Sequence, residues 1–378
     1  MIVALNFNIM ANLALRNSIR VIKYFGYTLL TLLLAVILYL GISWLATPRA
    51  ELVETTPFAG DYWHNPYQNV NLTNVYSANF HAHTNAWGMF TDGRDATPEG
   101  LYDAYRRMGF DVIAISDYQS INRFRSTEPD YIPVYERGYN IRKTHQLVLG
   151  ARRVIHFDVI LPQTTRMKQY LINGLQGTGE LIVLAHPKSW GGYSDEDLLQ
   201  LTGYDLFEVL NRHNDVQEKA WDLVLSSGKL VYILANDDSR DMTNWHQVGR
   251  HFTRIFAENT NAENILNALK QGQHYGVVMP VLPEETFDQK AERFRNLPNV
   301  TRFEMVDGTL FVQMDEPSKE VALIGDLGVE LALFAGEDEV VFDLNSENVT
   351  YVRAKIFLPD GVIYYFNPIT RSVGLGHL

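Results

Sequence analysis

The chain has 378 residues, of which 46% are hydrophobic and 20% charged, so it can bury a core and is longer than a typical single domain. Its net charge of −12 argues against a nucleic-acid partner, because binding a phosphate backbone requires clustered Lys and Arg. The sequence contains no cysteine, which excludes disulfides and thiolate ligands, so any metal must be held by His, Asp or Glu.

Residues 24–46 form an uncharged, apolar stretch that is long enough to cross a bilayer. Three basic residues and no acidic one precede it. The positive-inside rule therefore predicts that residues 1–23 are a cytoplasmic tail and that everything after Ala46 is periplasmic or otherwise extracytoplasmic. A cleaved signal peptide is the alternative, but its apolar region is usually shorter. We expect a retained single-pass anchor, with the lipid bilayer as its partner.

Residues 47–75 contain three prolines and little periodicity, and we expect them to form a stalk or linker. From residue 76 onward, short apolar runs typical of buried strands alternate with helical stretches. This repetition predicts an α/β barrel or a doubly wound sheet over residues 76–280. The predicted strands cover residues 76–82, 111–116, 146–151, 181–186, 206–211, 230–237 and 275–279, and the predicted helices cover 97–109, 164–175, 194–201, 216–227 and 261–271.

Residues 281–378 have a different sequence pattern, which predicts a connecting helix at 284–295 followed by short strands. The pairs Asp307–Gly308 and Asp360–Gly361 each separate two apolar runs, which is a strong hairpin signal. We expect a small domain that resembles a β-sandwich.

Polar residues end several of the predicted strands, where an α/β barrel carries its reactive groups. His81 and His83 are one residue apart, so both rings can point to one face. An isolated pair of this kind is more often structural. Further His, Asp and Glu residues at later strand ends make a metal site the better interpretation. These later residues are Asp117, His186, Glu208, Asp237 and Asp238.

The succession "NFHAHTN", "GFDVIAISDY", "LIVLAHP", "LFEVLN" and "ILANDDSRD" resembles the PHP family (polymerase and histidinol phosphatase) over residues 76–279. The resemblance implies a distorted (β/α) barrel that binds up to three divalent metals and hydrolyses phosphoesters. It also implies metal ligands at His81, His83, His186 and Asp238. The carboxy-terminal stretch "YVRAKIF" resembles a β module that follows the barrel in some exported members.

Three positions depart from the family pattern. Tyr118 and Arg240 stand where the family has histidines, and Arg152 falls near the place of its bridging glutamate. Arginine is a permanent cation that cannot bind a metal. The resemblance therefore implies a reduced, mononuclear site. His156 is a weaker match to a further ligand, and Glu208 matches a glutamate that would support the ligands from behind.

The sequence thus predicts a hydrolase, most consistent with a phosphoesterase, that uses one Zn²⁺ or Mn²⁺ and its bound water. In this hypothesis His186 is a ligand or proton shuttle and Asp117 orients a ligand or the water. Arg152 and Arg240 would bind an anionic small-molecule substrate.

The alternative is a metal-free, catalytically inactive module in the same fold that binds a glycan, peptide or protein outside the membrane. Aromatic side chains on the predicted rim loops would line its binding surface, although simple loop packing explains them equally well. These side chains are Tyr131, Trp190, Tyr193 and Trp245.

Overall fold

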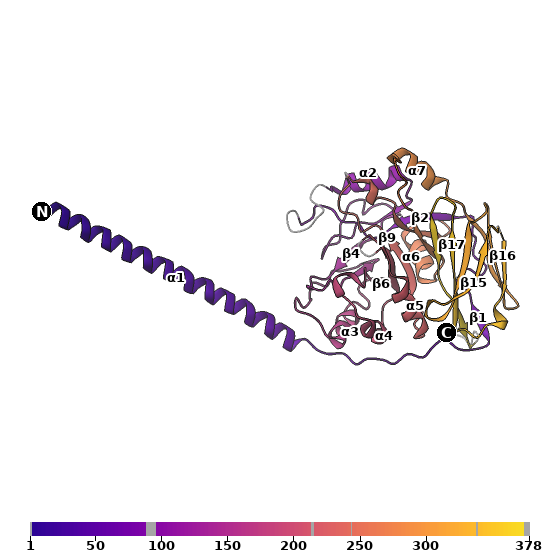
Figure 1. Ribbon diagram of the computed structural model, residues 1–378, viewed down its shortest axis with the longest axis horizontal. Coiled ribbons are helices and arrows are strands. Elements are labelled where there is room, and N and C mark those ends of the chain that lie inside the picture. The colour runs from indigo at the N-terminus through magenta and orange to yellow at the C-terminus, as the bar shows by residue number, and fades with distance from the viewer. Residues whose placement is uncertain (1, 88–95, 213–214, 243, 338, 374–378) are drawn as a thin grey trace.

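The computed structural model describes residues 2–87, 96–212, 215–242, 244–337 and 339–373 (Figure 1). Helix α1 (Ile2–Ala46) projects from the body of the molecule and continues through the segment that we expected to be a separate tail. Its part from Leu15 to Ala46 is long and apolar enough to cross a membrane, a property that a signal sequence would share. The prediction of one apolar amino-terminal helix is confirmed.

A six-stranded sheet carries most of the residues that the sequence points to. Strands β6, β7 and β9 are parallel, as their continuous apolar runs predict. Strand β5 is antiparallel to β6, and β4 is antiparallel to β5, so the β4–β5 hairpin forms one end of this sheet. The strands are β4 (Val134–Arg137), β5 (Gln146–Leu149), β6 (Leu181–Leu184), β7 (Leu206–Asn211), β8 (Asp215–Val216) and β9 (Tyr232–Asn236).

A ten-stranded sheet joins the middle of the chain to its carboxy-terminal part. Strand β11 pairs antiparallel with both β10 and β18, so hydrogen bonding is continuous across the boundary that we predicted at residue 280. The strands are β1 (Tyr62–His64), β2 (Val75–Asn79), β3 (Val112–Ile113), β10 (His251–Phe256), β11 (His274–Val278), β14 (Glu320–Ile324), β15 (Glu330–Ala335), β17 (Tyr351–Phe357), β18 (Ile363–Phe366) and β19 (Ile369–Ser372).

The third sheet consists of β12 (Val300–Val306), β13 (Thr309–Met314) and β16 (Glu339–Asp343). The predicted hairpin at Asp307–Gly308 connects β12 to β13, and both residues have positive φ angles, as a two-residue turn of this kind requires. Side chains of this sheet share one hydrophobic core with those of β14 and β17. The two sheets are therefore linked through one core, and one of them extends into the preceding α/β region.

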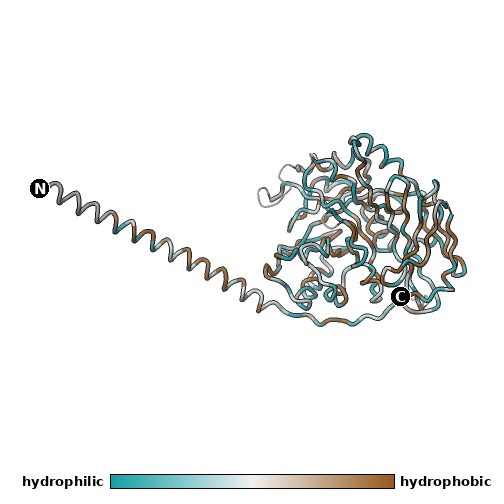
Figure 2. Tube along the Cα trace, in the orientation of Figure 1, coloured by the Kyte–Doolittle hydropathy of each residue, from teal (hydrophilic) through white to brown (hydrophobic). Residues whose placement is uncertain are grey.

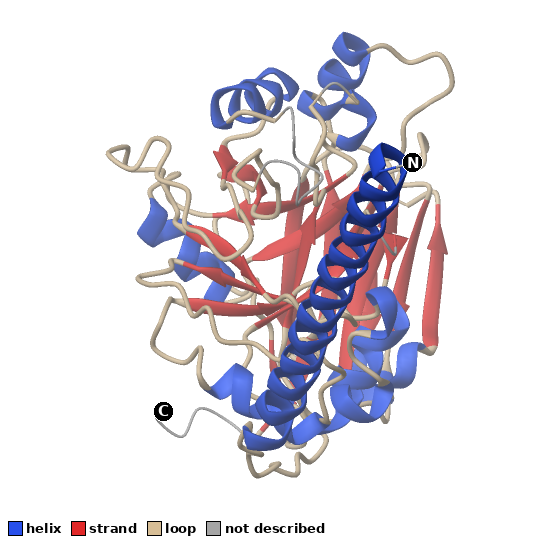
Figure 3. Cartoon of the chain, turned by 90° about the vertical axis from the view of Figure 1, so that its left-hand side faces the viewer, coloured by secondary structure: helices blue, strands red, loops and turns tan. Residues whose placement is uncertain are grey.

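Helices flank the sheets on several sides, while carboxy-terminal strands such as β15 and β16 lie at the outside of the body (Figures 1 and 3). The predicted cap of α2 is confirmed, since the Thr97 side chain accepts a hydrogen bond from Gly100 N and Pro98 is the first helical residue. The other helices of the body lie within one to three residues of their predicted bounds. The body helices are α2 (Pro98–Met108), α3 (Thr165–Asn173), α4 (Asp195–Gln200), α5 (Glu218–Ser226), α6 (Ala262–Lys270) and α7 (Phe287–Arg295).

The mixed α/β class is confirmed, whereas the described strands form three sheets and no closed barrel. Two isolated bridges connect the segments that follow β2 and β3 to the six-stranded sheet. Ala82 pairs with Ser239, and Tyr118 pairs with Glu136. The candidate site lies at this junction of the two large sheets.

A buried ionic network holds the carboxy-terminal strands against α5. Arg353 on β17 donates to both carboxylate oxygens of Asp222, at 2.8 and 2.7 Å, and to Glu218 at 2.7 Å. Lys355 donates to the other oxygen of Glu218 at 2.9 Å, and the Tyr351 hydroxyl donates to Asp222 at 2.9 Å. The two predicted domains are thus joined by paired charges as well as by the sheet.

Candidate metal centre

The two histidines of the "HAH" motif follow β2 and are buried, with exposed fractions of 0% for His81 and 1% for His83. Their ring centroids are 5.2 Å apart, so the structure brings the two rings together as the alternating geometry of an extended segment predicts. The backbone N–H of His83 donates to the carbonyl of Ser239, which fixes this segment against the one that follows β9.

Glu136, on β4, lies among four histidines. Its Oε1 is 2.5 Å from His145 Nδ1 and 3.0 Å from His186 Nε2. Its Oε2 is 3.1 Å from His83 Nε2 and 3.4 Å from His81 Nε2. Each carboxylate oxygen therefore faces a different pair of imidazoles, and the side chain is fully buried.

Asp238, which follows β9, contributes the second carboxylate. Its Oδ1 is 3.5 Å from His81 Nε2 and 3.4 Å from His83 Nε2. Asp238 and His186 both have positive φ angles, 47° and 29°, which are rare for residues other than glycine. Such backbone strain is concentrated at functional sites, where the surrounding structure holds it in place.

Arg240 brings a permanent positive charge next to this carboxylate. Its Nε and Nη2 donate to Asp238 Oδ1 at 3.2 and 3.1 Å, and Nη2 also donates to the Tyr118 hydroxyl at 2.7 Å. The Tyr118 ring stacks on that of His83, with centroids 4.4 Å apart. Tyr118 and Arg240 thus border the cluster as a hydrogen-bonded pair, at the predicted positions of departure from the family pattern.

Glu208 on β7 accepts hydrogen bonds from two residues of the cluster and so orients them. It accepts a hydrogen bond of 2.8 Å from His81 Nδ1, which leaves Nε2 of that ring directed at Glu136 and Asp238. Its other oxygen accepts from the backbone N–H of His186 at 2.7 Å. A carboxylate that fixes the tautomer and orientation of a histidine is the usual support for a metal ligand.

The electrostatics of the cluster reflect several carboxylates buried among imidazoles. Burial alone would lower the pKa of His81, but the charges of Asp238, Glu208 and Glu136 raise it well above its ordinary value. Burial would raise the pKa of Glu136, but the neighbouring His145 and His81 lower it well below its ordinary value. The carboxylates therefore favour added positive charge at this point.

The donor set fits divalent metal ions. Three overlapping groups of ligand atoms lie within 4.8 Å of one another: His81, His83 and Glu136; His81, His186 and Asp238; and Glu136, His145 and His186. Among the described residues, both ring nitrogens of His83, Nε2 of His81 and Oε2 of Glu136 lack a hydrogen-bond partner although they are buried. Buried polar atoms are rarely left in this state, and imidazole with carboxylate suits Zn²⁺, Mn²⁺ or Fe²⁺.

Two predicted site residues lie away from the cluster atoms. Asp117 accepts hydrogen bonds from Thr84 and Asn122, so it organises the loop after His83. Arg152 was expected near the bridging glutamate, but it lies on the surface with 58% of its side chain exposed and pairs with Glu180. The structure brings His81, His83, His186, Asp238 and Arg240 together and leaves Arg152 outside. His156, the weaker match, is exposed.

Sequence reasoning missed Glu136 and His145. Strand β4 is short, follows Pro133 and reads Val-Tyr-Glu-Arg, so it lacks the continuous apolar run used to find the other strands. His145 immediately precedes β5, and because β5 runs antiparallel to β6, its amino end lies where the other strands have their carboxyl ends. A search restricted to carboxyl ends of strands could not find it.

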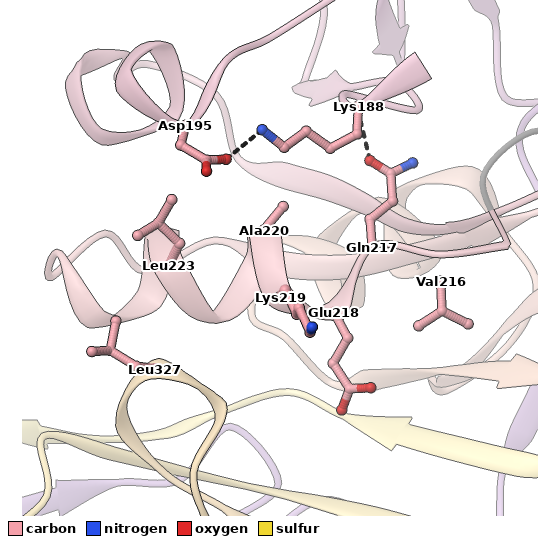
Figure 4. Close-up of a pocket in the computed structure, with 9 residues that line it drawn as sticks. All are labelled: Lys188, Asp195, Val216, Gln217, Glu218, Lys219, Ala220, Leu223 and Leu327. Carbon is pink, nitrogen blue, oxygen red and sulfur yellow. Dashed lines mark hydrogen bonds and ion pairs between the residues drawn. The ribbon is translucent and has the colours of Figure 1, made fainter. Parts of the chain in front are cut away.

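Another cavity, of about 790 Å³, lies beside α5 and contains none of the cluster residues (Figure 4). Lys188 is ion-paired with Asp195 there, and the Lys188 backbone N–H donates to Gln217. Of the aromatic side chains proposed for a binding surface, Trp190 is 72% exposed and Tyr193 is buried. They do not form a common aromatic surface, since one of them lies in the core.

No family model and no curated protein matches the chain. Among solved structures it is similar to a two-domain protein from Bacteroides vulgatus that contains a predicted PHP-like metal-dependent phosphoesterase. The identity is 11%, the TM-score is 0.38, and the match covers 85% of this chain and 99% of that one. It is also similar to a lesion-specific endonuclease from Pyrococcus furiosus, with 16% identity, a TM-score of 0.38 and coverage of 52% and 56%. The chain thus spans about half the length of the endonuclease. Both likenesses are remote, so the proposal below rests on the buried cluster.

Proposed function

We propose that the protein is a metal-dependent hydrolase of phosphoesters. The observation that carries this proposal is the buried cluster of four histidines and two acidic residues, with three overlapping groups of donor atoms within 4.8 Å. The resemblance of the sequence motifs to the PHP family favours phosphoesters among the substrates that a hydrolytic metal site can use.

We further propose that the site holds two ions in place of the single ion expected from sequence. Six ligand residues exceed the three or four that one catalytic ion needs. Glu136 would bridge, because Oε1 faces His145 and His186 while Oε2 faces His81 and His83. When bound, such ions polarise a phosphoryl oxygen and lower the pKa of a coordinated water.

The chain's own residues would select an anionic substrate. Arg240 is 6% exposed and is held by Asp238 and Tyr118, so its guanidinium is a fixed positive charge beside the ligands. Its attachment to Asp238 also makes that carboxylate less available to metal than Glu136 is. We therefore assign Glu136, not Asp238, the main role in holding the ions.

The same proposal includes the position of the protein in the cell. Helix α1 would anchor the chain in the bilayer, with residues 1–23 cytoplasmic and the body periplasmic or extracytoplasmic. The length and composition of Leu15–Ala46 support the anchor, and the three basic residues before Tyr24 support the orientation.

The experiment is metal analysis of the full chain in detergent after exposure to Zn²⁺ or Mn²⁺, together with hydrolysis of p-nitrophenyl phosphate and its diester. The wild type is compared with the double variant His81→Ala/His83→Ala and with Glu180→Gln as a surface control. We expect about two ions per chain and hydrolysis in the wild type and the control, and neither in the double variant.

The absence of metal from all three proteins would contradict the proposal and favour the metal-free binding module. Metal in the wild type without hydrolysis of any phosphomonoester or phosphodiester would contradict the phosphoesterase assignment and leave a metal-binding protein. One ion per wild-type chain would favour the mononuclear site that the sequence predicts.

A further inference from the structure

A group of exposed apolar side chains lies on two segments next to the inner end of α1. The α1-proximal patch consists of Tyr139, Ile141, Phe157 and Ile160, which are 45%, 54%, 47% and 37% exposed. The two segments lie side by side, since Ile141 N donates to the carbonyl of Ile160 at 3.0 Å. Exposed apolar side chains gathered in this way mark an interaction surface.

The backbone under the patch is held firmly. The Asn140 side chain donates to three successive carbonyls, those of Val159, Ile160 and Leu161. Tyr139 N donates to Asp158 at 2.7 Å, and Asp158 is itself paired with the buried Arg137. These hydrogen bonds fix the two segments, and the apolar side chains point outward from them.

Helix α1 ends against these segments. The indole N–H of Trp44 donates to the carbonyl of Pro162 at 2.7 Å, and Ala50 N donates to the carbonyl of Arg166. Figures 1 and 2 show that α1 meets the body only at its carboxy-terminal end.

The charge of this region differs from that of the whole chain. The two patch segments, residues 139–143 and 154–166, contain three Lys or Arg residues and one acidic residue, whereas the chain carries a net charge of −12. Arg142 and Arg166 are exposed, and Lys143 is partly so. Aromatic and aliphatic side chains flanked by basic ones are the composition of a surface that lies on anionic lipid headgroups.

We propose that the α1-proximal patch docks on the bilayer in which α1 is anchored, with anionic phospholipid as the occupant. This inference rests on the proposed anchoring by α1 and not on the metal chemistry. The patch lies close to the end of α1, because Pro162, which accepts a hydrogen bond from Trp44, is two residues after Ile160. A modest tilt of α1 therefore brings the patch to the membrane surface. Its burial among lipid would add to the anchor by the hydrophobic effect and by charge.

Docking would also orient the candidate metal centre. The loop that carries Tyr139 and Ile141 joins β4 to β5, so it is flanked by Glu136 on one side and His145 on the other. Lipid contact at this loop would hold the cluster close to the headgroup layer. Phosphoesters at the membrane surface would then be the substrates presented to it.

The absence of native cysteine allows a site-specific test on the full chain. Single variants Ile37→Cys, Ile141→Cys and Val341→Cys are labelled with an environment-sensitive fluorophore and placed in nanodiscs that contain phosphatidylglycerol and nitroxide-labelled lipid. Ile37 reports insertion of α1. Val341, 50% exposed on β16 at the far side of the body, is the matched control for Ile141 (Figure 1).

We expect the nitroxide lipid to quench the labels at 37 and 141 and to leave the label at 341 bright. Adding Arg142→Glu or Arg166→Glu to the Ile141→Cys variant should weaken the contact by about five-fold per charge, and replacing phosphatidylglycerol with a zwitterionic lipid should weaken it similarly. Circular dichroism of the charge variants checks that the fold is intact.

Three outcomes would overturn the inference. Quenching at 37 without quenching at 141 would leave the anchor in place and exclude docking of the patch. No quenching at 37 would remove the anchor on which the inference rests, whatever the result of the metal experiment. Blue-shifted emission at 141 without quenching would show that the patch is covered by protein, as in a contact between two copies.

Discussion

Two groups of buried or partly buried carboxylates are neutralised in different ways. On α5, Asp222 and Glu218 are paired with Arg353 and Lys355 of β17, whose cationic side chains match the two acids. At the junction of the two large sheets, Glu136 lies instead among histidines. Imidazole is neutral near pH 7 unless its surroundings raise its pKa, so the second group depends on added protons or metal ions for its balance of charge.

This difference separates a structural site from one that can bind ions. Arginine keeps its charge at all relevant pH values and cannot coordinate metal, so the charges around Arg353 balance without an added ion. Imidazole nitrogens can exchange a proton for a metal ion. The following substitutions test whether the two groups behave in these two ways.

The largest effect is expected for Glu136→Gln. The amide keeps the size of the side chain but removes the negative charge that faces both pairs of histidines. Hydrolysis should fall by at least about 10³-fold and the metal content should fall with it, because the loss of the carboxylate proposed to hold the ions removes several kcal/mol of transition-state stabilisation. Steady-state kinetics and metal analysis on the same preparation measure both, with Glu180→Gln as the exposed control. Full metal content in the variant would show that Glu136 is not a ligand.

Arg353→Met should act on stability and leave metal binding alone. The substitution leaves Asp222, which is 2% exposed, without its permanent cation. We expect a loss of about 3 kcal/mol in the free energy of unfolding, which is the usual cost of breaking a buried ion pair. Denaturant titration of the body measures this loss. Metal content per folded chain should not change, and a parallel loss of metal would mean that the two regions are energetically coupled.

Glu208→Gln should have an intermediate effect on the candidate metal centre. Glu208 contacts the far nitrogen of His81 and the backbone of His186, so it orients ligands without facing the centre of the cluster. We expect metal affinity to fall about 10- to 100-fold, which is typical of the loss of a carboxylate that supports a histidine ligand. Competition with a chromophoric chelator measures the affinity. An affinity as low as that of Glu136→Gln would make Glu208 a ligand itself.

The sequence predicted those parts of the fold whose signals are local. Strands β6, β7 and β9 have continuous apolar runs, and the helices have caps such as Thr97 before Pro98. The pairing of β11 with β18 could not be predicted, because it joins residues almost 90 positions apart and no local pattern records it. The β-sandwich-like domain expected over residues 281–378 stays a prediction, and the pairing of β11 with β18 links that region to the preceding one by hydrogen bonds.

The structure brings some of the predicted site residues together and leaves others apart, and the strand pattern explains the difference. His81, His83, His186 and Asp238 follow strands with clear patterns, and the structure places them together. Glu136 belongs to the β4–β5 hairpin, whose short polar strand gave no signal. Arg152 was placed near the family's bridging glutamate by the resemblance alone, but it follows β5, and that end of the antiparallel strand lies away from the cluster.

The smallest effect is therefore expected for Arg152→Gln. Its ion pair with Glu180 is solvent-exposed, with side-chain exposed fractions of 58% and 46%, and such pairs contribute little because water and salt screen them. We expect a change of less than about 0.5 kcal/mol in the free energy of unfolding and no change in metal content or hydrolysis.

Arg240→Gln is the informative counterpart, since Arg240 is buried and contacts Asp238. Weaker substrate binding in Arg240→Gln alone would assign the anion to Arg240. A rise in the Michaelis constant in Arg152→Gln would instead return Arg152 to the site through a rearrangement of the loop after β5.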